Sequence, residues 1–356
     1  MFGLPGNIFA QSRSHLVSVA GHEVADALLK EPDPAALEAA LAWAGEDGNH
    51  ILTLADAAYP QSLLEIADPP PVLYVKGDPA LLARPALAMV GSRAPTVQGE
   101  ANAKAFAGSL GAAGLVIISG LAQGIDAAAH QGALAVQGGS TIAVIGTGID
   151  RVYPARNAAL AREIAAKGVI LSEFPLGTPP ARWNFPRRNR LIAGLSLGVL
   201  VVEATPESGS LITARLAAEA GREVFAIPGS IHSPQARGCH RLIREGAKLV
   251  ETAEDVFEEL RGRIGGELPR RAPPRPRQPP APSQPLPVSM PAHLAPEAIH
   301  VLESLGSEAR DIDTLALATG LAVEALHAHL LVLELEGLAV RQAGGGFLRL
   351  YTARVA

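Results

Sequence analysis

The chain has 356 residues, enough for two or three compact domains joined by linkers. Hydrophobic residues make up 48% of it and aromatic residues only 4%, so the core must be built mainly from Ala, Val, Leu and Ile. The single cysteine, Cys239, excludes an internal disulfide, and the formal net charge of −5 excludes a protein that coats nucleic acid indiscriminately. Any nucleic-acid site must therefore be a local basic patch.

The N-terminal segment lacks the basic flank and the long apolar stretch of a signal peptide. Elsewhere, no apolar run approaches the roughly 20 residues that a helix needs to cross a bilayer. We therefore expect a cytoplasmic protein with no membrane partner, and a lone cysteine fits that reducing compartment.

Residues 1–65 are predicted to form a small helical domain. Glu23–Leu29 and Ala35–Ala44 have helical patterns, and Leu4–Ile8 has the look of a degenerate helix-hairpin-helix (SAM-like) turn. Three consecutive prolines at 69–71 then mark a change to strand–helix alternation.

Residues 66–263 are predicted to form an α/β domain. Short apolar runs alternate there with Ala-rich amphipathic stretches, which predicts right-handed βαβ units around a doubly wound, mostly parallel sheet. The expected strands are Leu87–Val90, Val116–Ile118, Ile142–Ile145, Val169–Leu171, Val199–Val202 and Val224–Ile227, and the expected helices are Glu100–Ala113, Ala127–Ala135, Ala158–Ala166 and Leu211–Ala220.

A Pro/Arg-rich linker is predicted over 264–294, and a winged-helix domain over 295–356. Helical patterns at Pro296–Leu305, Asp311–Ala318 and Val323–Glu336 are followed by a hairpin pattern, which is typical of a winged helix. From Ala292 onward there are four Arg and eight Asp or Glu, a formal charge of 4 − 8 = −4. A protein-contact or autoregulatory role is therefore at least as well supported there as DNA binding.

Two predicted strands end in glycine-bearing turns. The first runs into Gly91-Ser92-Arg93, where free amides, a helix dipole and an arginine fork would suit a phosphate; a plain tight turn is the alternative. The second runs into Ser119-Gly120 and on to Asp126. Both turns would line the crevice at the carboxyl edge of the sheet, where α/β folds bind ligands.

Two further patterns are weaker indicators of chemistry. Asp126 and His130 share a helix face and could do acid–base or metal work, but a helix cap with His130 bonded to it is favoured, because no third ligand has a metal-site spacing. The turn at Gly146-Thr147-Gly148 lacks the third glycine of a dinucleotide fingerprint, since Arg151 stands in its place. No cofactor and no metal are therefore expected.

The most informative stretch is 182–190. It carries Arg182, Arg187, Arg188 and Arg190, with Trp183 and Phe185 between them and no acidic residue. Arginine neutralises phosphates and aromatic rings stack on bases, so this mixture favours an unpaired nucleic-acid strand. The alternative is a surface loop whose arginines bridge carboxylates and whose tryptophan belongs to the core.

Taken together, these motifs resemble the DprA/Smf family of DNA-processing proteins. The resemblance covers roughly residues 56–260 and includes a terminal winged helix after a proline-rich linker. The motifs that carry it are Gly91-Ser92-Arg93, the 119–126 run with His130, Gly146-Thr147-Gly148 with Tyr153-Pro154 and Asn157, the 185–194 stretch, the 208–214 stretch and Pro228-Gly229-Ser230.

The resemblance implies an extended Rossmann-like fold that binds single-stranded DNA, protects incoming DNA, forms a homodimer and loads a RecA-type recombinase in natural transformation, without catalysis. It implies a dimer contact along a helix from His240 to Leu249. It also implies a nucleic-acid site built from Gly91, Ser92, Arg93, Ser119, Gly120, Arg182, Phe185, Arg187, Arg188, Asn189 and Arg190.

One enzyme remains as the alternative: a Rossmann-like nucleoside monophosphate phosphoribohydrolase of the lysine-decarboxylase-like type. Glu203 would polarise the ribose in that case. Such enzymes carry a PGGxGT turn, whereas the corresponding turn here reads ESGSLIT from residue 207, which favours the binding protein.

Overall fold

A computed structural model describes residues 5–31, 33–263, 294–305, 310–342 and 345–350. Contacts divide the chain into two units, Met1–His50 and Ile51–Ala356, so the division falls earlier than the boundary predicted after residue 65. Apart from Leu294, the predicted linker over 264–294 lies outside the described residues.

The first unit is helical, as predicted. Ser12 caps α2 by accepting a hydrogen bond from the backbone N–H of His15, and Asp33 caps α4 through that of Ala35. Residues 5–8 of the expected helix-hairpin-helix turn belong to a five-residue helix, and Leu4 lies outside the described residues. The helices are α1 (Pro5–Phe9), α2 (Arg13–Ala20), α3 (His22–Leu29) and α4 (Pro34–Ala44).

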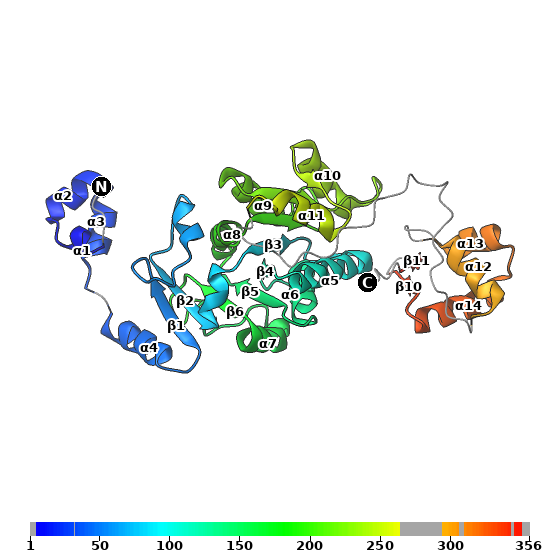
Figure 1. Cartoon of the computed structure of the whole chain (residues 1–356), viewed down its shortest axis with the longest axis horizontal. Helices are drawn as coiled ribbons and strands as arrows, with labels where there is room; N and C mark the ends of the chain where they lie inside the picture. Colours follow the sequence, from blue (N-terminus) through cyan, green and yellow to red (C-terminus); the bar gives the residue numbers. More distant parts are fainter. Residues whose placement is uncertain (1–4, 32, 264–293, 306–309, 343–344, 351–356) are drawn as a thin grey trace. The chain divides into compact units, whose positions relative to one another are not determined.

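The central domain is built on a nine-stranded sheet with the order β1-β2-β6-β5-β4-β3-β7-β8-β9. Strands β1 to β6 are labelled in Figure 1. The strands from β6 to β9 in this order pair in parallel, and β2 pairs antiparallel with β6. The predicted doubly wound, mostly parallel Rossmann-like sheet is therefore confirmed. Its strands are β1 (Asn49–Thr53), β2 (Val72–Gly77), β3 (Ala86–Val90), β4 (Val116–Ser119), β5 (Ser140–Val144), β6 (Val169–Ser172), β7 (Gly198–Val201), β8 (Glu223–Ala226) and β9 (Lys248–Leu249).

Side chains of the central strands alternate between two cores, one on each face of the sheet. Ala88 and Val90 of β3 join one core, whereas Leu87 and Met89 join the other. The first core includes α8, α9 and α10, and the second includes α5, α6 and α11. Strands buried on both faces explain the continuous apolar runs in the sequence. The helices are α5 (Val97–Ala112), α6 (Ile125–Leu134), α7 (Ala158–Lys167), α8 (Asn184–Leu195), α9 (Ser210–Glu219), α10 (Arg237–Arg244) and α11 (Ala253–Leu260).

Chain order reverses direction at β3. From β3 the chain adds β4, β5 and β6 on one side, and it later returns to add β7 on the other side. Open α/β sheets bind ligands beyond the carboxyl ends of the strands at such a switch point. The topology therefore directs attention to the loops that follow β3, β4 and β5.

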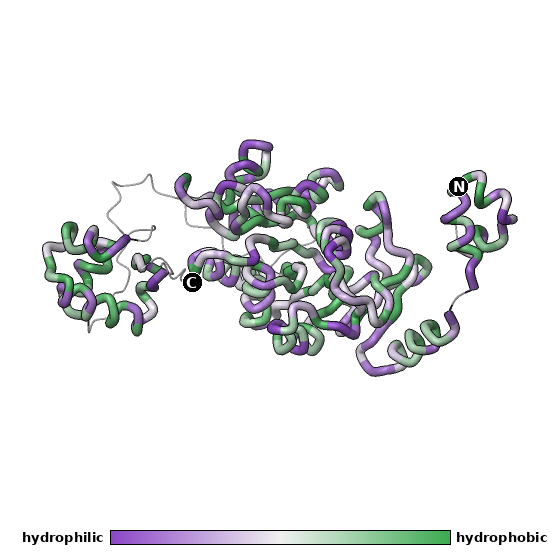
Figure 2. Tube along the Cα trace, turned by 180° about the vertical axis from the view of Figure 1, so that it is seen from behind, coloured by the Kyte–Doolittle hydropathy of each residue, from purple (hydrophilic) through white to green (hydrophobic). Residues whose placement is uncertain are grey.

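The C-terminal part forms three helices and a hairpin, as expected for a winged helix. Its helices each present apolar residues to a core of their own, which includes Leu315, Leu330 and Phe347, and the tube in Figure 2 alternates between apolar and polar colours along them. The elements are α12 (Pro296–Ser304), α13 (Ile312–Thr319), α14 (Val323–Leu335), β10 (Ala339–Arg341) and β11 (Phe347–Arg349), the two strands being antiparallel.

Within the described residues, no single helix is long and apolar enough to cross a membrane. Only α13 and α14 together satisfy the length and composition criteria, and they meet at a bend of 103°.

Candidate nucleic-acid interface

A hollow of about 50 Å³ lies at the carboxyl edge of the central sheet. Arg93 follows β3, Gly120 follows β4, and Tyr153 follows β5, where it forms a cis peptide bond with Pro154. The opposite wall comes from the first two turns of α8. The lining residues are Arg93, Gly120, Ala122, Gln123, Tyr153, Pro154, Phe185 and Arg188.

Arg188 is the buried cation of this hollow. Its residue is only 4% exposed, and its Nη1 donates to the carbonyl oxygen of Gly120 at 2.8 Å and to that of Val144. Burial lowers the pKa of Arg188 to about 10, which leaves it charged at neutral pH. A Cβ at position 120 would lie 2.6 Å from Nη2 of Arg188, so the arginine can approach the backbone only because residue 120 is glycine. Arg188 thus joins the ends of β4 and β5.

Asp126 holds the same turn through its backbone N–H groups. Its Oδ2 accepts hydrogen bonds from the backbone of Gly120 at 3.1 Å and of Ala122 at 3.3 Å. Burial raises the pKa of Asp126, while the nearby charge of Arg188 and the backbone donors act in the opposite direction. Leu121 between them has a φ of 59°, a conformation that L-residues adopt rarely, and Nδ2 of Asn157 donates to its carbonyl at 2.9 Å. The turn is therefore fixed before any ligand arrives.

His130 does not bond to Asp126, so that part of the prediction is wrong. Its Nδ1 lies 2.7 Å from Oγ1 of Thr141, whose hydroxyl donates to the carbonyl of Ile117 at 2.6 Å. Because that hydroxyl proton is already used, the ring N–H must be the donor to Thr141. Burial lowers the pKa of His130 to about 3, so the ring is neutral at physiological pH. Within the described parts of the chain, no group of three His, Cys, Asp or Glu residues could hold a metal ion.

Phe185 forms the aromatic wall of the hollow. Its ring centroid lies 5.8 Å from the guanidinium carbon of Arg93 and 5.6 Å from the ring centroid of Tyr153. A Cβ at Gly146 would lie 2.9 Å from this ring, so the glycine after β5 makes room for it. Arg93 is exposed and its charge lowers the pKa of Arg188. Two cations that line one hollow and repel each other favour an anion between them.

In the turn after β3, the glycine and the helix N-terminus have partners within the protein itself. A Cβ at Gly91 would lie 2.7 Å from Ile125, so this glycine is required by packing. The amide of Thr96 and its hydroxyl donate to the Glu203 carboxylate at 2.9 and 2.6 Å. The start of α5 was predicted to offer free amides to a phosphate, but Glu203 already supplies the negative charge that a helix N-terminus favours. Ser92 and Ser119 are buried, and neither lines the hollow.

The 182–190 stretch was predicted to bind an unpaired nucleic-acid strand, with a surface loop as the alternative, and most of it is the first half of α8. A helix points its side chains in different directions, so its arginines do not form one cluster. Arg188 faces the hollow, whereas Arg187 and Arg190 pair with Glu173 at 3.4 and 2.6 Å, and Arg190 also pairs with Asp68. Arg182 and Trp183 are exposed, and Asn189 is half-buried. Trp183 is thus not a core residue.

Of the eleven predicted nucleic-acid residues, the hollow brings together Arg93, Gly120, Phe185 and Arg188. Four lining residues were not in that set: Ala122, Gln123, Tyr153 and Pro154. Their signal in the sequence was present, because Ala122 and Gln123 continue the glycine turn after β4 and Tyr153-Pro154 follows the turn after β5.

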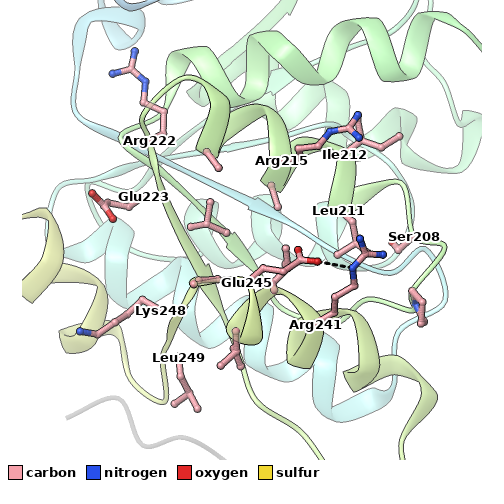
Figure 3. Close-up of a pocket in the computed structure, with 18 of the residues that line it drawn as sticks. Ser208, Leu211, Ile212, Arg215, Arg222, Glu223, Arg241, Glu245, Lys248 and Leu249 are labelled. Carbon is pink, nitrogen blue, oxygen red and sulfur yellow. Dashed lines mark hydrogen bonds and ion pairs between the residues drawn. The ribbon is translucent and has the colours of Figure 1, made fainter.

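The predicted dimer helix does not span 240–249. Helix α10 ends at Arg244, and Leu249 lies in β9, the last strand of the sheet. The glycine at 246 has a φ of 108°, which ends the helix and turns the chain into the strand. A groove of about 1040 Å³ lies between α9, α10 and the β8–β9 edge, with Leu249 and Lys248 at one end and the Arg241–Glu245 ion pair beside it (Figure 3).

Comparison with known protein families and proteins shows the family of this chain. The sequence model of DNA recombination-mediator protein A matches residues 50–261, and that of the DprA winged helix domain matches residues 273–345. The chain belongs to the DprA/Smf family. Protein Smf of Escherichia coli is 41% identical over 318 residues, which cover 89% of this chain and 82% of that protein. DNA processing protein DprA of Streptococcus pneumoniae is 51% identical over 208 residues, 58% of this chain and 73% of that protein.

Two solved DprA structures have the same fold. DNA processing protein A of Streptococcus pneumoniae has a TM-score of 0.63 at 44% identity and covers 70% of this chain and 87% of its own. DNA processing protein A of Helicobacter pylori, described for its unique single-stranded DNA binding mode, has a TM-score of 0.54 at 32% identity and covers 60% and 96%. The resemblance seen in the sequence is therefore confirmed at the level of family and fold.

Proposed function

We propose that this DprA/Smf protein binds single-stranded DNA at the hollow between Arg93 and α8, protects incoming strands there and loads a RecA-type recombinase on them. The observation that carries the DNA-binding part is that two cations, Arg93 and Arg188, line one hollow together with the Phe185 ring, on which Arg93 lies. Its Helicobacter pylori relative, described as binding single-stranded DNA, supports the same assignment.

An unpaired strand suits this hollow better than a duplex. At about 50 Å³ it has no room for a base pair, but a single phosphate or the edge of one unstacked base could enter. Aromatic rings beside arginines bind unpaired strands by stacking and charge, with little sequence preference. With a formal net charge of −5, the protein would repel DNA from most of its surface and attract it here.

We propose that binding occurs without catalysis and without a cofactor. The enzyme alternative needs a free Glu203, yet both oxygens of that carboxylate accept hydrogen bonds from Thr96 and its side chain fills the space beside Gly99. His130 is buried and bonded to Thr141, out of reach of a substrate in the hollow. Neither residue is placed as a general base.

The first test compares a labelled single-stranded oligonucleotide with its duplex by fluorescence anisotropy over a salt series. We expect tighter binding to the single strand and an affinity that falls steeply with salt, because bound phosphates release counterions. Nucleoside monophosphate serves as competitor and as substrate. Hydrolysis of the monophosphate, with no binding of the oligonucleotide, would replace this proposal by the enzyme.

Protection of the strand is tested by nuclease digestion of the bound oligonucleotide. Recombinase loading is tested by the rate at which RecA forms filaments on it.

We also propose a homodimer formed along the β9 edge. Leu249 is 43% exposed on a two-residue edge strand, and it lines the same groove as the apolar residues Leu211 and Ile243. Figure 3 shows this groove with Leu249 and Leu211 labelled. An edge strand has unpaired backbone groups that a second copy can satisfy, and an exposed leucine beside it adds apolar area. His240 is less accessible to a partner, because its Nε2 contacts the carbonyl of Gly229 at 3.0 Å.

Leu249→Glu is expected to convert the dimer to a monomer in sedimentation velocity, because it places a charge in a buried apolar contact. Leu317→Glu, at a leucine of α13 that is 89% exposed, is the matched control and should leave the sedimentation coefficient unchanged. A wild-type protein that sediments as a monomer at micromolar concentration would exclude this interface.

A further inference from the structure

Trp183 is the most exposed aromatic side chain beside the hollow. The residue is 77% exposed, although a tryptophan usually buries most of its large ring. Within the described parts of the chain, its indole has no hydrogen-bond or ring partner. The fold therefore keeps a ring in solvent that it does not use for its own core.

The backbone that carries this ring is held rigidly. The N–H of Asn184 donates to the carbonyl of Ala181 at 3.0 Å, and Nδ2 of Asn184 donates to that of Gly146 at 3.1 Å, in the turn after β5. Trp183 itself has helical φ and ψ angles and immediately precedes α8. An exposed ring on a fixed support is prepared to bind, because little conformational entropy of the backbone is lost on contact.

The surroundings of Trp183 favour nucleic acid over an apolar partner. Arg182 precedes it, Arg187 lies one turn further along α8, and the segment 182–190 contains no acidic residue. Phe185, the aromatic wall of the hollow, is two positions further along the chain. Residues two apart point to nearly opposite sides of a helix, so the two rings flank its first turn. A strand that leaves the hollow across the start of α8 would pass from Phe185 to Trp183.

We propose that Trp183 is a second base-binding subsite, outside the hollow, which stacks on an unpaired nucleobase of the strand that Arg93 and Phe185 hold. This inference depends on the proposed single-strand binding. Stacking uses the π face that every base has, so the subsite is expected to bind any of the four bases. Only an abasic site should bind less well. It would lengthen the DNA footprint without adding a phosphate contact.

The chain allows a direct test, because it has only two tryptophans, Trp43 and Trp183. In a Trp43→Phe background, all indole emission comes from Trp183. We expect a thymidine oligonucleotide to quench this emission on binding, and a strand with abasic sites to bind through its phosphates with far less quenching. Trp183→Ala should weaken binding roughly tenfold, as expected for one lost stacking contact. Its salt dependence should stay that of the wild type, since no phosphate contact is removed.

Trp183→Phe is the matched variant and should retain most of the affinity, because a smaller ring still stacks. Thermal unfolding of all three variants shows whether they fold, which the exposure of residue 183 predicts. If the oligonucleotide binds in anisotropy while emission and Trp183→Ala affinity stay unchanged, the subsite is refuted and single-strand binding stands. If no oligonucleotide binds at all, the proposed function itself fails. If Trp183→Ala changes only the sedimentation coefficient, the ring is a protein contact and the inference is overturned.

Discussion

Arg188→Met is expected to lower the free energy of unfolding of the central domain by roughly 3–5 kcal/mol. The substitution keeps an unbranched, flexible side chain but removes the guanidinium that donates to Gly120 and Val144. Two buried carbonyl oxygens would lose a donor, and the buried Asp126 carboxylate would lose the nearby positive charge. Urea unfolding followed by circular dichroism measures the shift in the midpoint of this domain.

The matched control is Arg187→Met, one residue earlier on the same helix. The Arg187 side chain is 59% exposed and pairs at 3.4 Å with the buried Glu173, which keeps its closer partner Arg190 at 2.6 Å when Arg187 is lost. The expected cost is therefore that of a solvent-exposed ion pair, about 0–1 kcal/mol. A loss as small for Arg188→Met as for Arg187→Met would contradict the role assigned to Arg188. The affinity for single-stranded DNA is also expected to fall in Arg188→Met. That loss alone would not establish a DNA contact, because Arg188 also holds the turns that line the hollow.

Arg93→Ala combined with Arg182→Ala is expected to weaken single-strand binding by more than tenfold at moderate salt. Both side chains are exposed near the start of α8, so their loss removes phosphate contacts without opening the core. Two lost contacts should reduce the slope of log affinity against log salt by about 1.4, because each contact on a single strand contributes about 0.7. Anisotropy over a salt series gives both quantities, and the unfolding midpoint should not move.

Arg162→Ala combined with Lys167→Ala removes the same net charge from two exposed positions on α7. We expect this pair to bind DNA nearly as the wild type does, because α7 contributes neither to the hollow nor to the segment at the start of α8. Equal losses in both double variants would mean that overall charge, and not the hollow, controls affinity. In that event the proposal that single-stranded DNA binds between Arg93 and α8 would have to be abandoned.

The two arginine experiments separate support from contact within one site. Arg188 is buried and joins two strand ends, whereas Arg93 stands in solvent against the Phe185 ring. The first is expected to affect stability and binding together, and the second only binding. Gly120 links both roles, because a side chain there would displace the Arg188 guanidinium from the turn that lines the hollow.

Local pattern was enough to predict the α/β fold and the family. Six central strands were predicted because each is a short apolar run buried on both faces, and the helices between them have the spacing of one apolar face. The winged helix was predicted for the same reason. Glycine turns after β3, β4 and β5 identified the correct edge of the sheet, since parallel strands all end on one side.

Tertiary structure decided what the individual residues in those turns do. A glycine in the sequence does not show whether it leaves space for a ligand or for a neighbouring side chain. In the structure, Gly91 leaves space for Ile125 and Gly120 leaves space for Arg188. Glu203 lies 107 positions from Thr96, so its occupation of the α5 N-terminus has no local signal. The two-residue strand β9 is equally invisible, because its pairing with β8 and not its own sequence makes it a strand.

By itself, the sequence determined the order of the elements, the family and the edge of the sheet where single-stranded DNA would bind. These depend on periodicity and on residues close together in the chain. Only the tertiary structure divided the basic stretch of 182–190 into a buried Arg188, an Arg190 paired with Glu173 and an exposed Trp183. The physical reason is that helix α8 turns successive side chains by about 100°, and the direction of each is fixed by what packs around it.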